Sequence, residues 1–143
     1  TPHQKEWEKL SGIDLASQTE DKSRRAVQNF PQGTVIVEKG PHTRIWTSGQ
    51  EEGYQLDVGG PYQATGGMGD TLAGMIAGFA GQFPQVSLYE RVVVATYLHS
   101  AIAEDLSKEA YVVLPTTISQ EIPKWMKKWS DNSNENVENE TFS

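Results

Sequence analysis

GGPYQATGGMGD, at residues 59–70, runs directly into the apolar segment TLAGMIAG at residues 71–78. Glycines ahead of a helix let the backbone turn sharply and turn its peptide N–H groups outward. The first helical turn adds unpaired N–H groups and the positive end of the helix dipole. The stretch therefore predicts a helix start that forms an anion hole, for which phosphate is the usual ligand.

Asp70 lies where this helix begins, and it is the side chain of the stretch that can take up a proton. A phosphate cradle with a carboxylate at its edge suggests phosphoryl transfer to a hydroxyl, with the carboxylate as general base. A lone Asp70 would be an ordinary helix-start carboxylate, but five glycines in residues 59–69 favour catalysis. No Lys-Ser or Lys-Thr follows the glycines, so the stretch is not a Walker loop, and it is not a dinucleotide-binding GxGxxG after a first strand.

Three further segments accompany the glycine-rich one in a specific order, and they read TPHQKEW at 1–7, TVIVEKGPHT at 34–43 and YLHSAIA at 97–103. Together with ATGGMGDTLAG at 64–74, they resemble the NAD(P)H-hydrate dehydratase family of the ribokinase-like superfamily. The resemblance covers roughly residues 1–126, and Thr-Pro-His-x-x-Glu combined with Thr-Gly-Gly-x-Gly-Asp is its specific signature. Members are usually about twice this length, still within a single large α/β domain, so the chain resembles the C-terminal half of such an enzyme.

The resemblance implies an α/β fold, namely the C-terminal portion of a ribokinase-like layered α/β/α fold. We expect residues 1–129 to form this half of the dehydratase domain. Residues 130–143 are polar, acidic and almost free of core residues, so we expect a disordered tail there.

The resemblance also assigns site residues. It implies that Asp70 is the catalytic base and contacts the substrate, that His3 contacts the hydrated nicotinamide, and that Gly66, Gly67 and Gly69 supply the anion hole. The nucleotide-site candidates from the lysine turn are Lys39, Gly40, Pro41, His42 and Thr43. The alternatives without a functional role are that His3 is a helix cap or a surface residue and that Lys39 is a solvated charge.

The function implied is repair of hydrated NADH or NADPH (NADHX or NADPHX), with ADP or ATP as co-substrate and Mg²⁺ bridging the phosphates. One alternative is a ribokinase-like kinase for a vitamin or sugar alcohol. Another is a non-catalytic fragment that needs its N-terminal half, because half of such a sheet leaves an open edge and an uncovered apolar face.

The amino-acid composition limits the kinds of molecule that this chain is expected to bind. The net charge of −7 argues against nucleic acid, which requires a basic face. No apolar run is long enough to span a bilayer, so we expect a cytoplasmic protein without a membrane partner. Cysteine is absent, which excludes disulfides and thiolate metal sites. We also expect a homo-oligomer, and Trp125 and Trp129 fit a core anchor or a subunit contact equally well.

Periodicity predicts the regular elements. We expect strands at 35–37 and 44–47, of undetermined relative direction, and helices at 4–10, 19–30, 71–83, 88–106 and about 117–129. Gly74 and Gly78 each cost about 1 kcal/mol relative to Ala in a helix, so we expect a close backbone contact that requires them. His99 falls on the apolar face of its helix and is expected to be a packed core residue.

Overall fold

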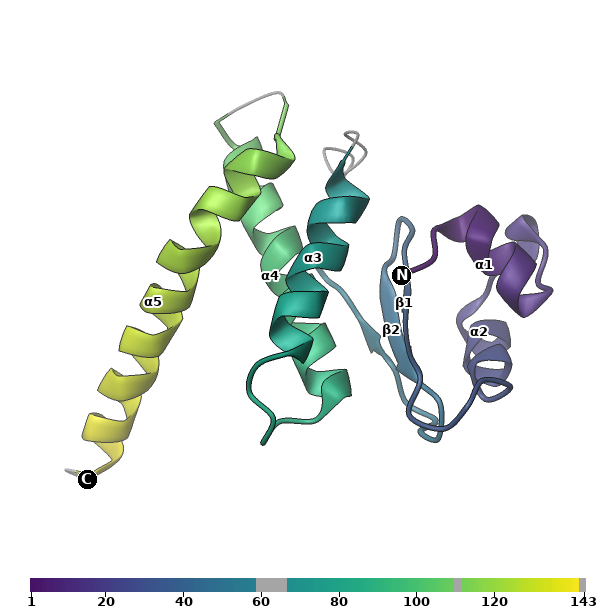
Figure 1. The fold of residues 1–143 in the computed structure, drawn as a ribbon, viewed down its shortest axis with the longest axis horizontal. Helices are drawn as coiled ribbons and strands as arrows, with labels where there is room; N and C mark the ends of the chain where they lie inside the picture. Colours follow the sequence, from purple (N-terminus) through teal and green to yellow (C-terminus); the bar gives the residue numbers. More distant parts are fainter. Residues whose placement is uncertain (59–66, 110–111, 142–143) are drawn as a thin grey trace.

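The computed structural model describes residues 1–58, 67–109 and 112–141. Figure 1 shows a small sheet between two groups of helices. The elements in chain order are α1 (Gln4–Ser11), the 3-10 turn η1 (Leu15–Ser17), α2 (Glu20–Val27), β1 (Val35–Glu38), β2 (Arg44–Thr47), β3 (Tyr54–Gln55), α3 (Met68–Ala80), α4 (Leu88–Ser107) and α5 (Pro115–Thr141).

The sheet has the order β1-β2-β3, and both pairings are antiparallel. Its side chains alternate between two covered faces, as the two-residue period of a strand requires. One face packs on α1 and α2 through a cluster of Trp7, Ala26, Val27, Ile36 and Trp46. The opposite face packs on α3 and α4 through Val37, Ile45, Leu56, Leu72 and Val92. The described residues are therefore mostly helical, with a small antiparallel sheet that has helices on both faces.

A second core lies among α3, α4 and α5, on the side of α3 and α4 away from the strands in Figure 1. It consists of Met68, Met75, Leu98, Ile102, Ala103, Val113 and Ile118. The middle of α4 is buried on nearly all sides because it contacts β1, β2, α3 and α5. Among the described residues, no helix combines the length and apolar character needed to cross a bilayer.

The exposed face of α3 contradicts one prediction. This helix begins at Met68 and ends at Ala80, and it buries Met68, Leu72 and Met75 on one side only. A Cβ added at Gly74 or Gly78 would meet no described atom within 4 Å. The close backbone contact expected at these two glycines is therefore wrong for this chain. Together with Ala73 and Ala77 they form an exposed face of small residues.

The last helix is longer than predicted. It runs from Pro115 to Thr141 with Pro123 inside it, whereas the sequence predicted an end near Trp129 and a disordered tail from residue 130. Lys127 on one turn pairs with Asp131 on the next at 3.1 Å, a spacing that supports helix. Helix α5 thus continues past the end expected near Trp129, and the division of the chain into a domain at 1–129 and a tail at 130–143 stays a prediction.

Two tryptophans of α5 contribute to the core. Trp125 and Trp129 are partly buried and pack against the cluster formed by α3, α4 and α5. The ring of Trp129 also lies 6.3 Å from that of Tyr97 on α4. These contacts confirm the core-anchor interpretation, whereas a subunit contact stays a prediction.

His99 is the buried titratable group of α4. It is 2% exposed, as predicted for a core residue, and neither ring nitrogen finds a hydrogen-bond partner in the described part of the chain. Burial lowers the pKa of His99 from 6.5 to about 4. The folded chain therefore holds this imidazole neutral at pH values where the unfolded chain protonates it.

We expect the free energy of unfolding to fall as the pH drops from about 6.5 to about 4, because the unfolded state binds the proton of His99 first. The total loss from this group is on the order of 3 kcal/mol. Urea unfolding at several pH values measures it, with His99→Leu as the control that removes the titration. Parallel pH profiles for the two proteins would contradict the prediction.

Candidate nucleotide site

The opening Thr-Pro-His motif forms the start of α1. His3 is the N-cap, its Nδ1 accepting the N–H of Glu6 at 3.2 Å, while Glu6 Oε2 accepts the N–H of His3 at 2.8 Å. The backbone N–H of His3 is the main cause that lowers the pKa of the Glu6 carboxyl. With Nδ1 acting as acceptor, the neutral imidazole carries its proton on Nε2. The helix-cap alternative for His3 is confirmed, and Nε2 of the exposed ring lies 3.4 Å from Glu6 Oε1.

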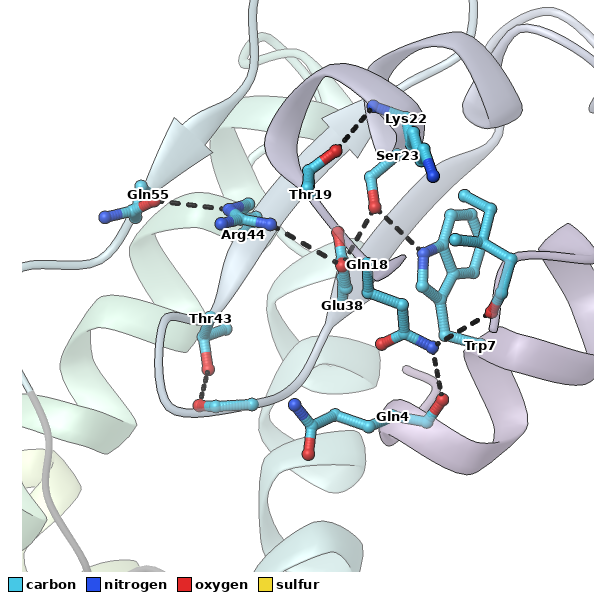
Figure 2. Close-up of polar contacts among 12 residues, drawn as sticks. Gln4, Trp7, Gln18, Thr19, Lys22, Ser23, Glu38, Thr43, Arg44 and Gln55 are labelled. Atoms are coloured by element: carbon cyan, nitrogen blue, oxygen red, sulfur yellow. Dashed lines mark hydrogen bonds and ion pairs between the residues drawn. The ribbon is translucent and has the colours of Figure 1, made fainter. Parts of the chain in front are cut away.

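The lysine turn follows β1 and lies against this opening motif. The N–H of Lys39 donates to the carbonyl of Pro2 at 2.9 Å. A Cβ on Gly40 would lie 3.4 Å from the side-chain nitrogen of Gln4. Thr43 Oγ1 donates to the carbonyl of Gly40 at 3.4 Å, within the same turn (Figure 2). The turn is thus bound through the backbone N–H of Lys39 to Pro2, which precedes α1.

The side chain of Lys39 reaches the start of α3. A Cβ built on Gly69 would lie 3.3 Å from Lys39 Nζ. Asp70, the next residue, is exposed in the first turn of the helix. Three segments distant in the sequence therefore meet: the opening motif, the lysine turn and the glycine-rich helix start.

A glycine precedes the first turn of α3. Gly67 is its N-cap, with φ 89° and ψ −10°, a left-handed conformation that favours glycine. A Cβ there would also approach Pro115 Cγ at 3.2 Å. Within the described residues no side chain caps this helix, so its first-turn N–H groups remain available for an anion. Gly66 lies outside the described residues.

A polar pocket of ≈ 150 Å³ lies on the α1 side of the lysine turn. Its lining includes the predicted residues Lys39 to His42 but not Thr43. It also includes four residues that sequence reasoning missed, namely Gln4, Gln18, Glu38 and Arg44. Glu38 had a usable signal, since it is an acidic residue at the end of the apolar run VIVE. The other three carried none, because their proximity depends on tertiary packing.

Glu38 and its partners form a buried hydrogen-bonded network beside the pocket. Its carboxylate accepts hydrogen bonds from Ser23 Oγ and from Trp46 Nε1, each at 2.9 Å. Ser23 Oγ in turn accepts from Trp7 Nε1 at 3.0 Å. Arg44, opposite Glu38 in the strand pairing, places Nη1 3.8 Å from the carboxylate. Figure 2 shows Trp7, Ser23, Glu38 and Arg44 converging from α1, α2, β1 and β2.

The described residues contain no group of three or more His, Cys, Asp or Glu side chains that could hold a metal ion. The chain therefore provides no all-protein cage for the predicted Mg²⁺ in this part of the fold. Mg²⁺ is commonly held by one or two carboxylates together with substrate phosphates. Asp70 is the carboxylate nearest in sequence to the helix start predicted to hold the phosphate.

Comparison with solved structures defines the class. A ribokinase-like superfamily protein from Enterococcus faecalis V583 matches with a TM-score of 0.81 and 47% identity, over 90% of this chain and 43% of that chain. An ADP/ATP-dependent NAD(P)H-hydrate dehydratase from Bacillus subtilis, co-crystallised with ATP/Mg²⁺, matches with a TM-score of 0.75 and 29% identity, over 89% and 46% of the two chains. The fold is therefore part of a ribokinase-like fold.

The family follows from the sequence comparison. The family model described as NAD(P)H-hydrate dehydratase matches residues 1–124. The ADP-dependent (S)-NAD(P)H-hydrate dehydratase of Streptococcus pneumoniae R6 is 71% identical over 127 residues, which are 89% of this chain and 44% of that protein. This chain belongs to the NAD(P)H-hydrate dehydratase family, and it spans less than half the length of each of the three proteins compared.

Proposed function

We propose that this chain is the C-terminal half of an ADP-dependent NAD(P)H-hydrate dehydratase and carries most of its nucleotide site. The observation that supports this most directly is the meeting of the Lys39 ammonium with Gly69, one residue before Asp70. A cation beside the N–H groups of a helix start favours the binding of a phosphate group. The names of the pneumococcal and Streptococcus thermophilus relatives favour ADP as the nucleotide.

Each site residue has a proposed task. When bound, ADP supplies the phosphoryl group that converts the ring hydroxyl of the hydrate into a better leaving group. Asp70 takes the proton of that hydroxyl as its oxygen attacks phosphorus. Lys39 and the N–H groups at Gly67 and Gly69 hold the phosphate charge. His3 contacts the hydrated nicotinamide of the substrate.

The transfer leaves AMP and a phosphate ester of the hydrate. Breaking of the ring C–O bond then releases phosphate, and loss of a proton from the neighbouring ring carbon to water forms the C=C bond that restores the dihydronicotinamide ring. Gly66 belongs to the proposed anion hole by resemblance. Gly40, Pro41, His42 and Thr43 shape the nucleotide side of the site. NADHX and NADPHX are both proposed substrates, and ATP is the alternative nucleotide. A homo-oligomer, a cytoplasmic location and the absence of a nucleic-acid partner stay predictions.

One assay separates the proposal from a vitamin or sugar kinase. The complete enzyme that contains this half is incubated with ADP and NADH hydrate, and the absorbance of the reduced nicotinamide is followed. Return of that absorbance supports the dehydratase. A stable phosphorylated product without that return would instead identify a kinase. The Thr-Pro-His-x-x-Glu opening favours the dehydratase, because the resembling sugar kinases lack it as a unit.

We predict that Gly69→Val weakens ADP binding about tenfold, because its side chain displaces the Lys39 ammonium, and charge-assisted hydrogen bonds are worth about 1.5–3 kcal/mol. Gly67, not Gly69, has the positive φ at this helix start, so the effect comes from the added side chain and not from the backbone angle. Calorimetric titration with ADP measures the effect. Gly74→Ala on the exposed face of α3 is the control and should stabilise the helix by about 1 kcal/mol. Equal ADP affinity for Gly69→Val and the control would remove Gly69 from the site.

A further inference from the structure

Glu38 is a buried carboxylate to which the proposed mechanism gives no task. It is 5% exposed, at the last position of β1. Both of its oxygens accept hydrogen bonds from buried donors, Ser23 Oγ and Trp46 Nε1. A buried charge is costly unless it is paired and hydrogen-bonded, so this carboxylate is held in one place by its partners.

These partners come from elements on both sides of Glu38 in the sequence. Ser23 belongs to α2 and receives the indole N–H of Trp7 from α1. Trp46 belongs to β2, and so does Arg44, whose guanidinium also donates through Nε to Gln55 of β3 at 3.2 Å. The carboxylate therefore joins two helices and the neighbouring strand to the end of β1 (Figure 2).

The next residue along the chain is Lys39. Glu38 is the last residue of β1 and points toward Ser23 of α2, whereas Lys39, the first residue after the strand, places its Nζ beside Gly69 of α3. The backbone N–H of Lys39 is also held by the Pro2 carbonyl. The backbone of Lys39 is therefore fixed by the held side chain of Glu38 and by its own N–H bond to Pro2. From this position Lys39 Nζ lies beside Gly69 at the start of α3.

We infer that Glu38 is a positioning residue of the nucleotide site, which fixes the end of β1 and thereby directs the Lys39 ammonium to the phosphate of ADP at the start of α3. This inference rests on the proposed function, in which Lys39 binds ADP. Removing the carboxylate leaves the hydroxyl of Ser23 and the indole N–H of Trp46 without their acceptor. The end of β1 then relaxes, and the ammonium loses its fixed position.

The test compares ADP with adenosine, which lacks phosphate, as ligands of the full chain in NMR titrations. Glu38→Ala is expected to weaken ADP binding about tenfold and to change adenosine binding less than about twofold. Phe79→Ala removes a partly buried side chain near the other end of α3, ten residues from Gly69. This control should lower stability while leaving both affinities unchanged, which separates positioning from a general loss of stability.

Two further variants make the test independent of folding defects. Glu38→Gln keeps an acceptor for Trp46 and can donate to Ser23 Oγ, so it should restore ADP affinity to within about threefold of wild type. Glu38→Asp is one methylene shorter and should weaken ADP binding as Glu38→Ala does. It takes the place of Glu38→Ala if that variant does not fold. The indole N–H signals of Trp7 and Trp46 should shift in each variant.

A double-mutant cycle with Lys39→Met then tests whether Glu38 changes ADP affinity through Lys39. If Glu38 acts through Lys39, Glu38→Ala changes ADP affinity little in the Lys39→Met background. An equal effect in both backgrounds, or equal weakening of ADP and adenosine, overturns the positioning role alone. If Lys39→Met leaves ADP affinity unchanged, or the wild-type chain does not bind ADP, the proposed nucleotide site is contradicted and this inference falls with it.

Discussion

Asp70→Asn in the complete enzyme is expected to lower turnover by about 10²–10⁴-fold, the usual loss when a general base is removed. Asparagine keeps the size and position of the side chain but cannot take up the hydroxyl proton. Asp70 is exposed in the first turn of α3, one residue from the position facing Lys39. ADP affinity should therefore change little, because the N–H groups and the ammonium remain.

The measurement is steady-state turnover of NADH hydrate with ADP, together with calorimetric titration of ADP. Asp105→Asn is the matched control, since Asp105 is a surface residue of α4 paired with Lys108 at 3.5 Å. It should leave both quantities unchanged. Near-normal turnover of Asp70→Asn would show that the base is another residue.

The isolated 143-residue chain is expected to bind adenine nucleotide weakly and to show no measurable dehydratase turnover. Adding the N-terminal half that relatives possess should restore activity. In the described residues, the chain holds Lys39, Gly69 and Asp70 together, but on the substrate side it offers only His3 and Asp70. A ligand held by half of its contacts binds weakly, because the cost of ordering it is undiminished.

The exposed face of α3 provides a variant for this test. Gly78 has open space around it, so Gly78→Arg should leave the chain folded but obstruct a partner that covers the face. Gly78→Ala keeps the face small and is the control. Turnover of hydrate by the chain alone at the rate of a full-length enzyme would contradict the view that it is incomplete.

Much of the local structure could be predicted from the sequence. Apolar periodicity gave the five helices and the first two strands, because each pattern reflects which side of one element is buried. The glycine-rich stretch predicted a helix start, and among the described residues α3 begins directly after Gly67; its role in binding an anion stays a prediction. The ends of helices were less predictable, as α3 begins three residues earlier than expected and α5 ends twelve residues later.

By itself, the sequence determined the family, the order of the elements and the identity of Lys39, Gly69 and Asp70 as candidates for one site. Only the tertiary structure decided that Lys39 lies beside Gly69, that β1 and β2 are antiparallel, and that Glu38 gathers Ser23 and Trp46. The reason is physical. Local patterns record the burial of one element against its surroundings, whereas contacts between distant residues depend on how whole elements pack and on which donors meet which acceptors.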